Sequence, residues 1–277
     1  MTVDRGGLDV TGALPGDVGW ARRWRRRFPL AAVLTYALSL AAGVLLWEIV
    51  SRRYSTVFLP SPMETLSAAR ELAADGTLAA SIVASAQRIG IGWSLGVVVG
   101  VPVGLLMGQV TVIRRALDPY IEFFRFIPPI AFVTLAIIWL GIGEAAKVVL
   151  IFYTTVFIIT INTIAGVLAV DESKLRAAAS LGAGPGRTLV SVVFPSTVPY
   201  VVTGSRLAMG NSFLTIVSAE IVAAQEGLGA LIWTSRNYGR TEWVFVGIIV
   251  LGMMGFVFDR VIRIVATRLL GRYAVKV

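Results

Sequence analysis

Apolar residues run along this chain in long stretches that clusters of polar and charged residues separate. Stretches without a charged residue cover 28–47, 89–113, 148–170 and 243–258. A helix needs about 20 apolar residues to cross the hydrocarbon core of a bilayer, and its backbone groups must be hydrogen-bonded internally there. The pattern therefore predicts an all-α polytopic membrane protein with about six transmembrane helices. The expected spans are 28–50, 78–108, 112–140, 144–170, 197–223 and 242–267.

The distribution of positive charge predicts how the chain is oriented. When Arg88, Arg125 and Arg206 are set aside, sixteen of the lysines and arginines lie on the side of both termini and six on the other side. Because cytoplasmic loops are enriched in these residues, we expect both termini in the cytoplasm. The expected organisation is a basic cytoplasmic tail (1–27), a transmembrane domain (28–270) with a cytoplasmic segment at 171–190, and a short C-terminal tail (271–277).

Composition excludes several classes of function. The chain of 277 residues is 56% hydrophobic, only 15% charged, and carries a net charge of +9. A basic soluble protein would suggest nucleic-acid binding, but here the positive clusters flank apolar runs, so we expect membrane lipid and no nucleic acid. The absence of Cys and His excludes Cys/His zinc sites and a Ser-His-Asp triad, and we expect no metal site.

Two local patterns predict structure outside any chemical site. The glycines of the second span recur at every fourth position, a spacing that lets two helix backbones approach closely. They are Gly92, Gly96, Gly100, Gly104 and Gly108, and Ala84 and Arg88 extend the same step. Before this span, Ser61 and Glu64 have the spacing of a capping box and Gly76 can end the helix, so we expect a short helix there.

Polar residues inside the apolar runs are the candidate functional residues, since they are costly in lipid. The fifth span carries four, Arg206, Asn211, Ser212 and Glu220. They could form a network between helices or line a polar path, and we take the path as the hypothesis. We expect Arg88, Glu122 and Arg125 near span ends, where long side chains reach the interface. We also expect a local pair between Asp259 and Arg260.

The segment "DESKLRAAASLGAGPGRT" (171–188) interrupts the apolar pattern with a short helix. Asp171 and Glu172 suit the start of a helix, the alanines favour its continuation, and Gly182 and Gly184 can end it. Small side chains on an exposed helix favour close contact with another protein, although a plain helical loop is the alternative. The phosphate-loop pattern fails here, because it would place its lysine at Arg187 and its first glycine at Leu181. We therefore expect no ATPase activity and no cofactor in this chain.

The same segment resembles the "EAA" loop of permease subunits in bacterial ABC importers. Ala177, Ala178, Gly182, Val192 and Pro195 fit the spacing of that loop. Arg176 replaces its glutamate and Phe194 replaces its leucine. Four further stretches are similar to the nitrate/sulfonate/taurine branch of this family, so the resemblance covers about residues 59–270. These stretches are "LPSP" (59–62), "RFIPPIAF" (125–132), "WLGIGEAAK" (139–147) and "GLGALIWTSRNY" (227–238).

The resemblance implies a type I ABC importer permease fold in a bacterial plasma membrane. It implies a homodimer of two permease copies, two cytoplasmic ATPase subunits that hold ATP and Mg, and an extracytoplasmic substrate-binding protein. The solute would be a small anion such as a sulfonate, nitrate or bicarbonate. Residues expected to couple the permease to the ATPase are Glu172, Arg176, Ala177, Ala178, Gly182, Ala183 and Arg187. The alternatives are a gradient-driven transporter, for which the chain shows no internal repeat, and a membrane-embedded enzyme, for which it lacks catalytic groups.

Overall fold

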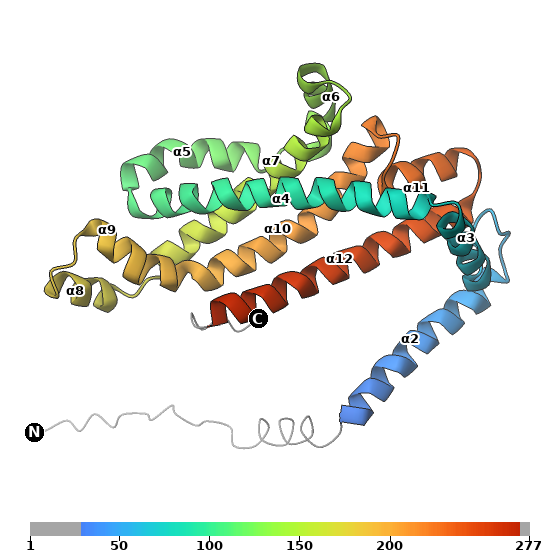
Figure 1. Ribbon diagram of the computed structural model, residues 1–277, viewed down its shortest axis with the longest axis horizontal. Helices are drawn as coiled ribbons and strands as arrows, with labels where there is room; N and C mark the ends of the chain where they lie inside the picture. The colour runs from blue at the N-terminus through green and yellow to red at the C-terminus, as the bar shows by residue number, and fades with distance from the viewer. Residues whose placement is uncertain (1–28, 272–277) are drawn as a thin grey trace, which may run out of the picture. The chain divides into compact units, whose positions relative to one another are not determined.

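The computed structural model describes residues 29–271, and the regular elements of this range are all helices (Figure 1). The chain forms two compact units, Met1–Tyr54 and Ser55–Val277. The expected tails lie outside the described residues, apart from Gly271. The first unit contributes α2 (Pro29–Ser51). The second contributes α3 (Pro62–Ala74), α4 (Thr77–Gln109), α5 (Thr111–Phe124), α6 (Pro129–Leu140), α7 (Glu144–Leu168), α8 (Glu172–Ser180), α9 (Pro185–Thr188), a π-helical turn (Leu189–Val193), α10 (Phe194–Ala223), α11 (Leu228–Asn237) and α12 (Thr241–Leu270).

Five stretches of the described helices are long and apolar enough to cross a membrane, and α5 with α6 makes a sixth if this bent pair is one span. They fall in α2, α4, α7, Pro185–Val222 and α12. The region of the expected third span, 112–140, forms two helices, because the chain bends by 98° between α5 and α6. Pro128 and Pro129 explain the break, since proline lacks an N–H donor and keeps the preceding residue out of the helical region.

The fifth span begins earlier than expected. Helical structure starts at Pro185 and continues through the π-helical turn to the end of α10. Pro195 and Pro199 each remove a backbone donor, and a π-helical turn is one way in which a continuous helix accommodates such a loss. α9 is therefore joined to α10 by continuous helix, with no loop between them.

The four-residue glycine step of α4 forms the contact with α7, as the sequence predicts. A Cβ atom placed on any of these five glycines would lie less than 3 Å from a side chain of α7. Gly92, Gly96, Gly100, Gly104 and Gly108 meet, in that order, Ile151, Thr155, Ile159, Thr163 and Val167. The partner residues are also four positions apart, so both helices present matching stripes and their backbones approach closely.

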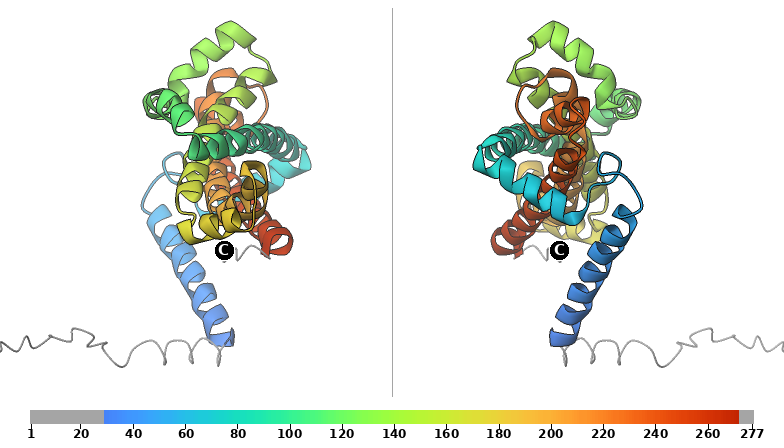
Figure 2. Two further views of the ribbon diagram at one scale, coloured as in Figure 1. Left: turned by 90° about the vertical axis from the view of Figure 1, so that its left-hand side faces the viewer. Right: turned by 90° about the vertical axis from the view of Figure 1, so that its right-hand side faces the viewer.

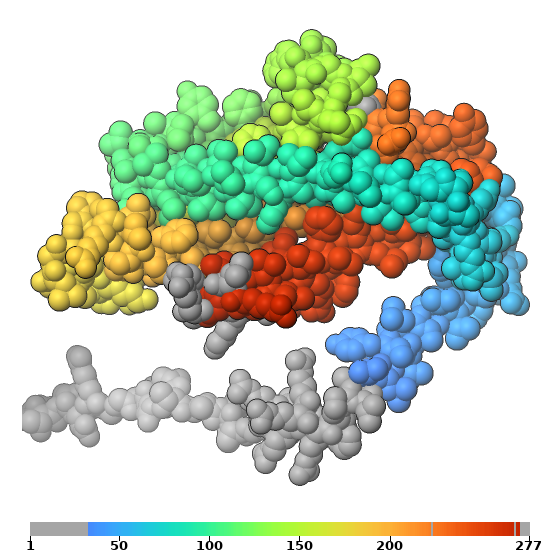
Figure 3. All heavy atoms as spheres, viewed as in Figure 1, coloured from blue at the N-terminus to red at the C-terminus, as the bar shows by residue number. Residues whose placement is uncertain are grey.

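Within the second unit, α10 and α12 complete the bundle begun by α4 and α7. A buried core joins Ile89 of α4, Ile151 of α7, Ile216 of α10 and Val246 of α12. The space-filling view shows α4 crossing the visible face, with α12 running beneath it (Figure 3). Figure 2 shows the α5–α6 region projecting away from the other helices of this unit.

The two ends of this bundle differ in what they carry (Figure 1). At one end, here named the α8 end, lie α8, α9 and the last turns of α12. At the other, the α11 end, lie α3 and α11. The expected capping box of α3 is confirmed: the Glu64 N–H donates to the Ser61 hydroxyl over 3.2 Å, and the Ser61 N–H donates to the Glu64 carboxylate over 2.7 Å.

Candidate functional site

The segment 171–188, which we expect to contact another protein, contains α8, and the capping and glycine signals of the sequence explain where this helix begins and ends. Asp171 caps α8 by accepting a hydrogen bond from the Ser173 N–H over 2.8 Å, and its bonds with Ser173 lower the pKa of this carboxyl. After α8, Gly182 adopts a φ of 72°, in the left-handed region that favours glycine. Gly184 does not share this role, because it is extended at φ −69° and precedes α9.

The residues of this segment divide into two sets by exposure. Ala178 is the buried residue of α8, and α8 packs against α9 and the π-helical turn. Ala177 is exposed, Ala183 is half-buried, and Gly182 and Arg187 are exposed. Glu172 and Arg176 form an exposed ion pair of 3.4 Å along the helix. The small size of Ala178 is therefore needed by the packing of the chain itself.

Leu181 is a candidate contact residue that sequence reasoning missed. It is 87% exposed at the end of α8 and borders a hollow of about 540 Å³ between α8, α9 and the start of α10. Lys174 and Arg187 also line this hollow. An apolar side chain beside cations at a helix end is the kind of feature that a partner protein covers, and its position directly before Gly182 was the available signal.

Two of the four fifth-span candidates lie inside the packed bundle. Ser212 and Glu220 are both fully buried within the chain. The Ser212 hydroxyl lies 3.2 Å from the Thr155 hydroxyl of α7 and donates to the Ala208 carbonyl. This corrects the expectation that both residues line a path: in this structure they belong to a network between helices.

Glu220 lies at the centre of a polar and charged group, here named the Arg88 cluster (Ser85, Arg88, Glu144, Lys147 and Glu220), in which every residue except the exposed Glu144 is buried. The Arg88 guanidinium donates to Glu220 over 2.7 Å and to Glu144 over 2.5 and 2.8 Å. The Ser85 hydroxyl donates to Glu220 over 2.7 Å, and Lys147 donates to Glu144 over 3.0 Å. The cluster joins α4, α7 and α10 near the α11 end.

The expectation that Arg88 reaches an interface is wrong, since this residue is only 5% exposed. The sequence carried a signal for the correct position. Arg88 lies four residues before Gly92 and so continues the stripe that faces α7. A side chain on that stripe points into the bundle, where a buried cation requires partners.

The Arg88 cluster also holds the connection that leads into α11. Arg88 donates to the Glu226 carbonyl over 2.6 Å, and the Gly229 N–H donates to Glu220 over 2.8 Å. Gly227 adopts a φ of 132°, and a Cβ there would lie 2.6 Å from a carboxylate oxygen of Glu220. Glycine is therefore required at this position for both its conformation and its size.

Arg206 pairs with another helix, and the expected local pair of Asp259 with Arg260 is wrong. The Arg206 guanidinium donates to the Asp259 carboxylate over 2.8 and 3.3 Å, joining α10 to α12. Arg263 lies 3.7 Å from the same carboxylate. Arg206 and Asp259 border a mostly apolar cavity of about 520 Å³ between these helices. Asn211 is half-buried and lines a different cavity, at the break between α5 and α6.

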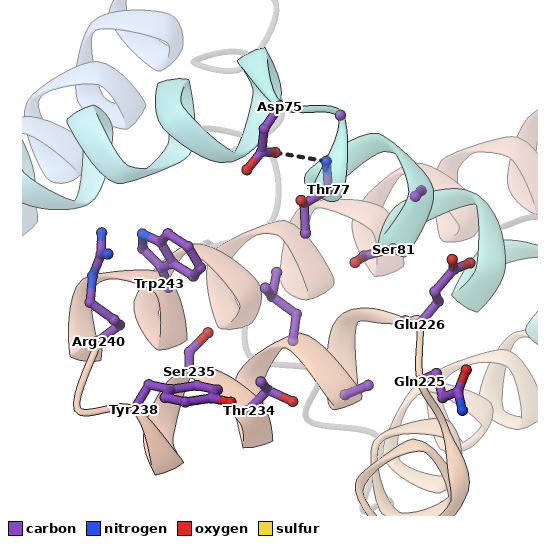
Figure 4. Close-up of a pocket in the computed structure, with 15 residues that line it drawn as sticks. Asp75, Thr77, Ser81, Gln225, Glu226, Thr234, Ser235, Tyr238, Arg240 and Trp243 are labelled. Carbon is purple, nitrogen blue, oxygen red and sulfur yellow. Dashed lines mark hydrogen bonds between the residues drawn. The ribbon is translucent and has the colours of Figure 1, made fainter.

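A larger cavity of about 800 Å³ lies at the α11 end (Figure 4). Figure 4 shows Asp75, Thr77 and Ser81 on one side and, on the other, Thr234 and Ser235 of α11 with Tyr238 directly after it. Glu226 and Gln225 lie toward one end of it, and Arg240 and Trp243 toward the opposite end. Within the described residues, the buried Ser235 hydroxyl and the Trp243 indole N–H have no hydrogen-bond partner. The cavity is thus lined with polar groups and bordered by two carboxylates.

Comparison with known proteins assigns the family. Residues 100–271 match the model of the binding-protein-dependent transport system inner membrane component. The chain is 34% identical to the taurine transport system permease protein TauC of Escherichia coli, over 90% of this chain and 94% of that protein. It is 30% identical to the nitrate import permease protein NrtB of Synechocystis, over 86% and 91% of the two chains.

A solved structure shares the fold. A chain of the MetNI methionine ABC transporter, in an inward-facing conformation, matches with a TM-score of 0.58 and 20% identity, over 68% of this chain and 96% of that chain. Helices of membrane-spanning length and the two permease relatives agree with this likeness. The protein is an integral membrane permease subunit of an ABC transporter, and it belongs to the family of binding-protein-dependent transport system inner membrane components.

Proposed function

We propose that this chain forms the membrane pathway of an ATP-driven importer for a small oxyanion. Its relatives are named for the transport of taurine and of nitrate. These two solutes share a compact, oxygen-rich anionic group, a sulfonate in one case and nitrate itself in the other. Arg125, at the break between α5 and α6, is a cation suited to such a solute.

The partners that we propose occupy opposite ends of the bundle. Two ATPase subunits, which hold the ATP and Mg, bind at the α8 end of a permease homodimer, and a substrate-binding protein docks at the α11 end. The distribution of charge supports this orientation, because Arg114, Arg115, Lys174, Arg176 and Arg187 all belong to loops or helix starts at the α8 end. That end is then cytoplasmic.

The observation that carries the proposal is the continuous helix that begins at α9, directly beside α8, and runs into the membrane. α8 packs on α9, which continues through the π-helical turn into α10. The membrane-spanning helix α10 contains Arg206, Asn211 and Glu220. A displacement of α8 by an ATPase is therefore passed to α10 through the contacts of α8 with α9 and the π-helical turn. Alternating access follows from the change in how α10 packs on α7 and α12.

Co-purification of the permease with its ATPase subunit tests this role of α8. Leu181→Asp places a charge on the most exposed apolar side chain of the segment, and we expect it to reduce the recovered ATPase at least several-fold. Tyr238→Asp is the matched control, because Tyr238 is 79% exposed at the α11 end and its substitution should leave ATPase recovery unchanged. Equal recovery with both variants would remove α8 from the ATPase contact.

A further inference from the structure

The break between α5 and α6 lies a little over a third of the way along α7. The Tyr153 hydroxyl donates to the Phe124 carbonyl, the last residue of α5. Tyr153 lies about 13 Å along the axis from Glu144, the first residue of α7, at 1.5 Å per residue. The break therefore lies well inside the segment that crosses the membrane, where irregular backbone is tolerated only if it is buried in protein or lines a cavity.

A cavity of about 300 Å³ opens at this break. Its walls include the aromatic rings of Phe126, Tyr153 and Phe157 and, as polar groups, Arg125, Thr154 and Asn211. Two of the hydroxyls are already engaged, since Tyr153 bonds to Phe124 and the Thr154 hydroxyl donates to the Ile151 carbonyl. The guanidinium of Arg125 and the side-chain amide of Asn211 remain as donors.

Arg125 is a cation without a counter-charge in this part of the molecule. Within residues 29–271 its guanidinium forms no ion pair, and it lies over the ring of Phe126, at 4.6 Å from the ring centroid. Glu122, one turn earlier on α5, does not pair with it either. A charged residue inside a membrane segment normally pairs or marks the path of an ion or substrate. Two other arginines of the membrane-spanning helices, Arg88 and Arg206, each have a carboxylate partner.

We propose that this cavity is an oxyanion site within the membrane, in which Arg125 and Asn211 bind the transported solute as it crosses. The guanidinium presents a planar fork of N–H donors that matches two oxygens of a nitrate, bicarbonate or sulfonate group. The Asn211 amide supplies a further donor from α10, and α6 directs the positive end of its dipole at the same break. Because Asn211 belongs to α10, a movement of α10 opens or closes the site.

This inference rests on the proposed function but is tested without the ATPase or the binding protein. The native chain contains no cysteine, so a single thiol can report on the cavity. Ile158→Cys places it on the wall without removing either donor, and Ile161→Cys provides a second position on the same wall. The full-length permease in membrane vesicles is labelled with an anionic and with a cationic methanethiosulfonate, and the two rates are compared.

We expect the anionic reagent to be favoured, and millimolar taurine or nitrate to slow its reaction. Arg125→Gln should lower the anionic-to-cationic rate ratio by roughly tenfold or more, the effect of removing a charge at close range in a medium of low dielectric constant, and should abolish protection. Arg125→Lys should keep the ratio and weaken protection, because lysine retains the charge and loses the planar fork. Asn211→Leu should likewise keep the ratio and weaken protection.

Arg114→Gln is the control, because it removes the same charge from the first turn of α5 and should change neither quantity. Thiols that react with neither reagent, a ratio that Arg125→Gln leaves unchanged, or an absence of protection by taurine, nitrate and bicarbonate would each overturn the site. If protection is found and ATP-driven transport is not, the site stands and the proposed importer function falls.

Discussion

Substituting Gly96 by alanine tests the close contact between α4 and α7. A Cβ at this position would lie 2.5 Å from the Cβ of Thr155 and 3.2 Å from the backbone nitrogen of Val156. Ordinary contact begins near 3.4 Å, so the two helices would have to separate by about 1 Å at this level. Backbone lies on both sides of the contact, and a rotamer change cannot relieve it.

The expected cost follows from two opposing effects. Overpacking of a close contact costs about 1–3 kcal/mol, while alanine is favoured over glycine within a helix by about 0.5–1 kcal/mol. Because backbone must move, we take the upper part of the first range and expect Gly96→Ala to lower the free energy of unfolding by about 2 kcal/mol. Gly90→Ala is the matched control on the same helix: its Cβ would meet nothing within 4 Å, so it should be neutral or slightly stabilising.

Unfolding of the purified protein in mixed micelles, followed by tryptophan fluorescence, measures both changes. The double variant Gly96→Ala/Thr155→Gly moves the small residue to the opposite helix and should be more stable than the sum of the single variants predicts. Equal stability of Gly96→Ala and Gly90→Ala would refute the contact. An additive double variant would show that Thr155 is not the residue that the new methyl group meets.

Further predictions concern other parts of the chain. Arg88→Met leaves Glu220 buried without its cation and should lower the free energy of unfolding by about 3 kcal/mol or more. Arg206→Met breaks an ion pair that is partly exposed and should lower it by less than about 1 kcal/mol. Equal losses for the two variants in the same unfolding assay would contradict this distinction. Asp171 has a lowered pKa, so its cap stabilises α8 above the unfolded pKa of about 3.9 and is lost as the pH falls through the folded value. The protection of the α8 amides from hydrogen exchange, measured relative to the intrinsic exchange rate at each pH, should therefore fall on acidification in the native chain and not in Asp171→Asn. Identical pH profiles of this protection would count against the cap.

Periodic patterns predicted the regular parts of this fold. The four-residue glycine step identified which face of α4 contacts another helix, and the capping box identified where α3 begins. Both signals are local, because they depend on the spacing of residues along one helix. The break at Pro128 and Pro129 was visible in the sequence as well, but the apolar run around it favoured a continuous span.

The partners of the buried charges could not be predicted in the same way. Arg88 and Glu220 are separated by more than 130 positions, and their pairing depends on how α4 and α10 cross. The sequence showed that a charge at either position is costly in lipid. It did not show that the two residues neutralise each other. Arg125, in contrast, has no ion-pair partner within the described residues. Its importance follows from this absence, which only the packed structure displays.

ATP-dependent uptake by proteoliposomes tests the central claim most directly. The permease is reconstituted with its ATPase subunits and a substrate-binding protein, and the accumulation of labelled taurine or nitrate is followed with and without ATP on the side of the ATPases. We predict accumulation that requires both ATP and the binding protein and that Leu181→Asp abolishes. Accumulation by the permease alone, driven by an ion gradient without ATP, would contradict the account.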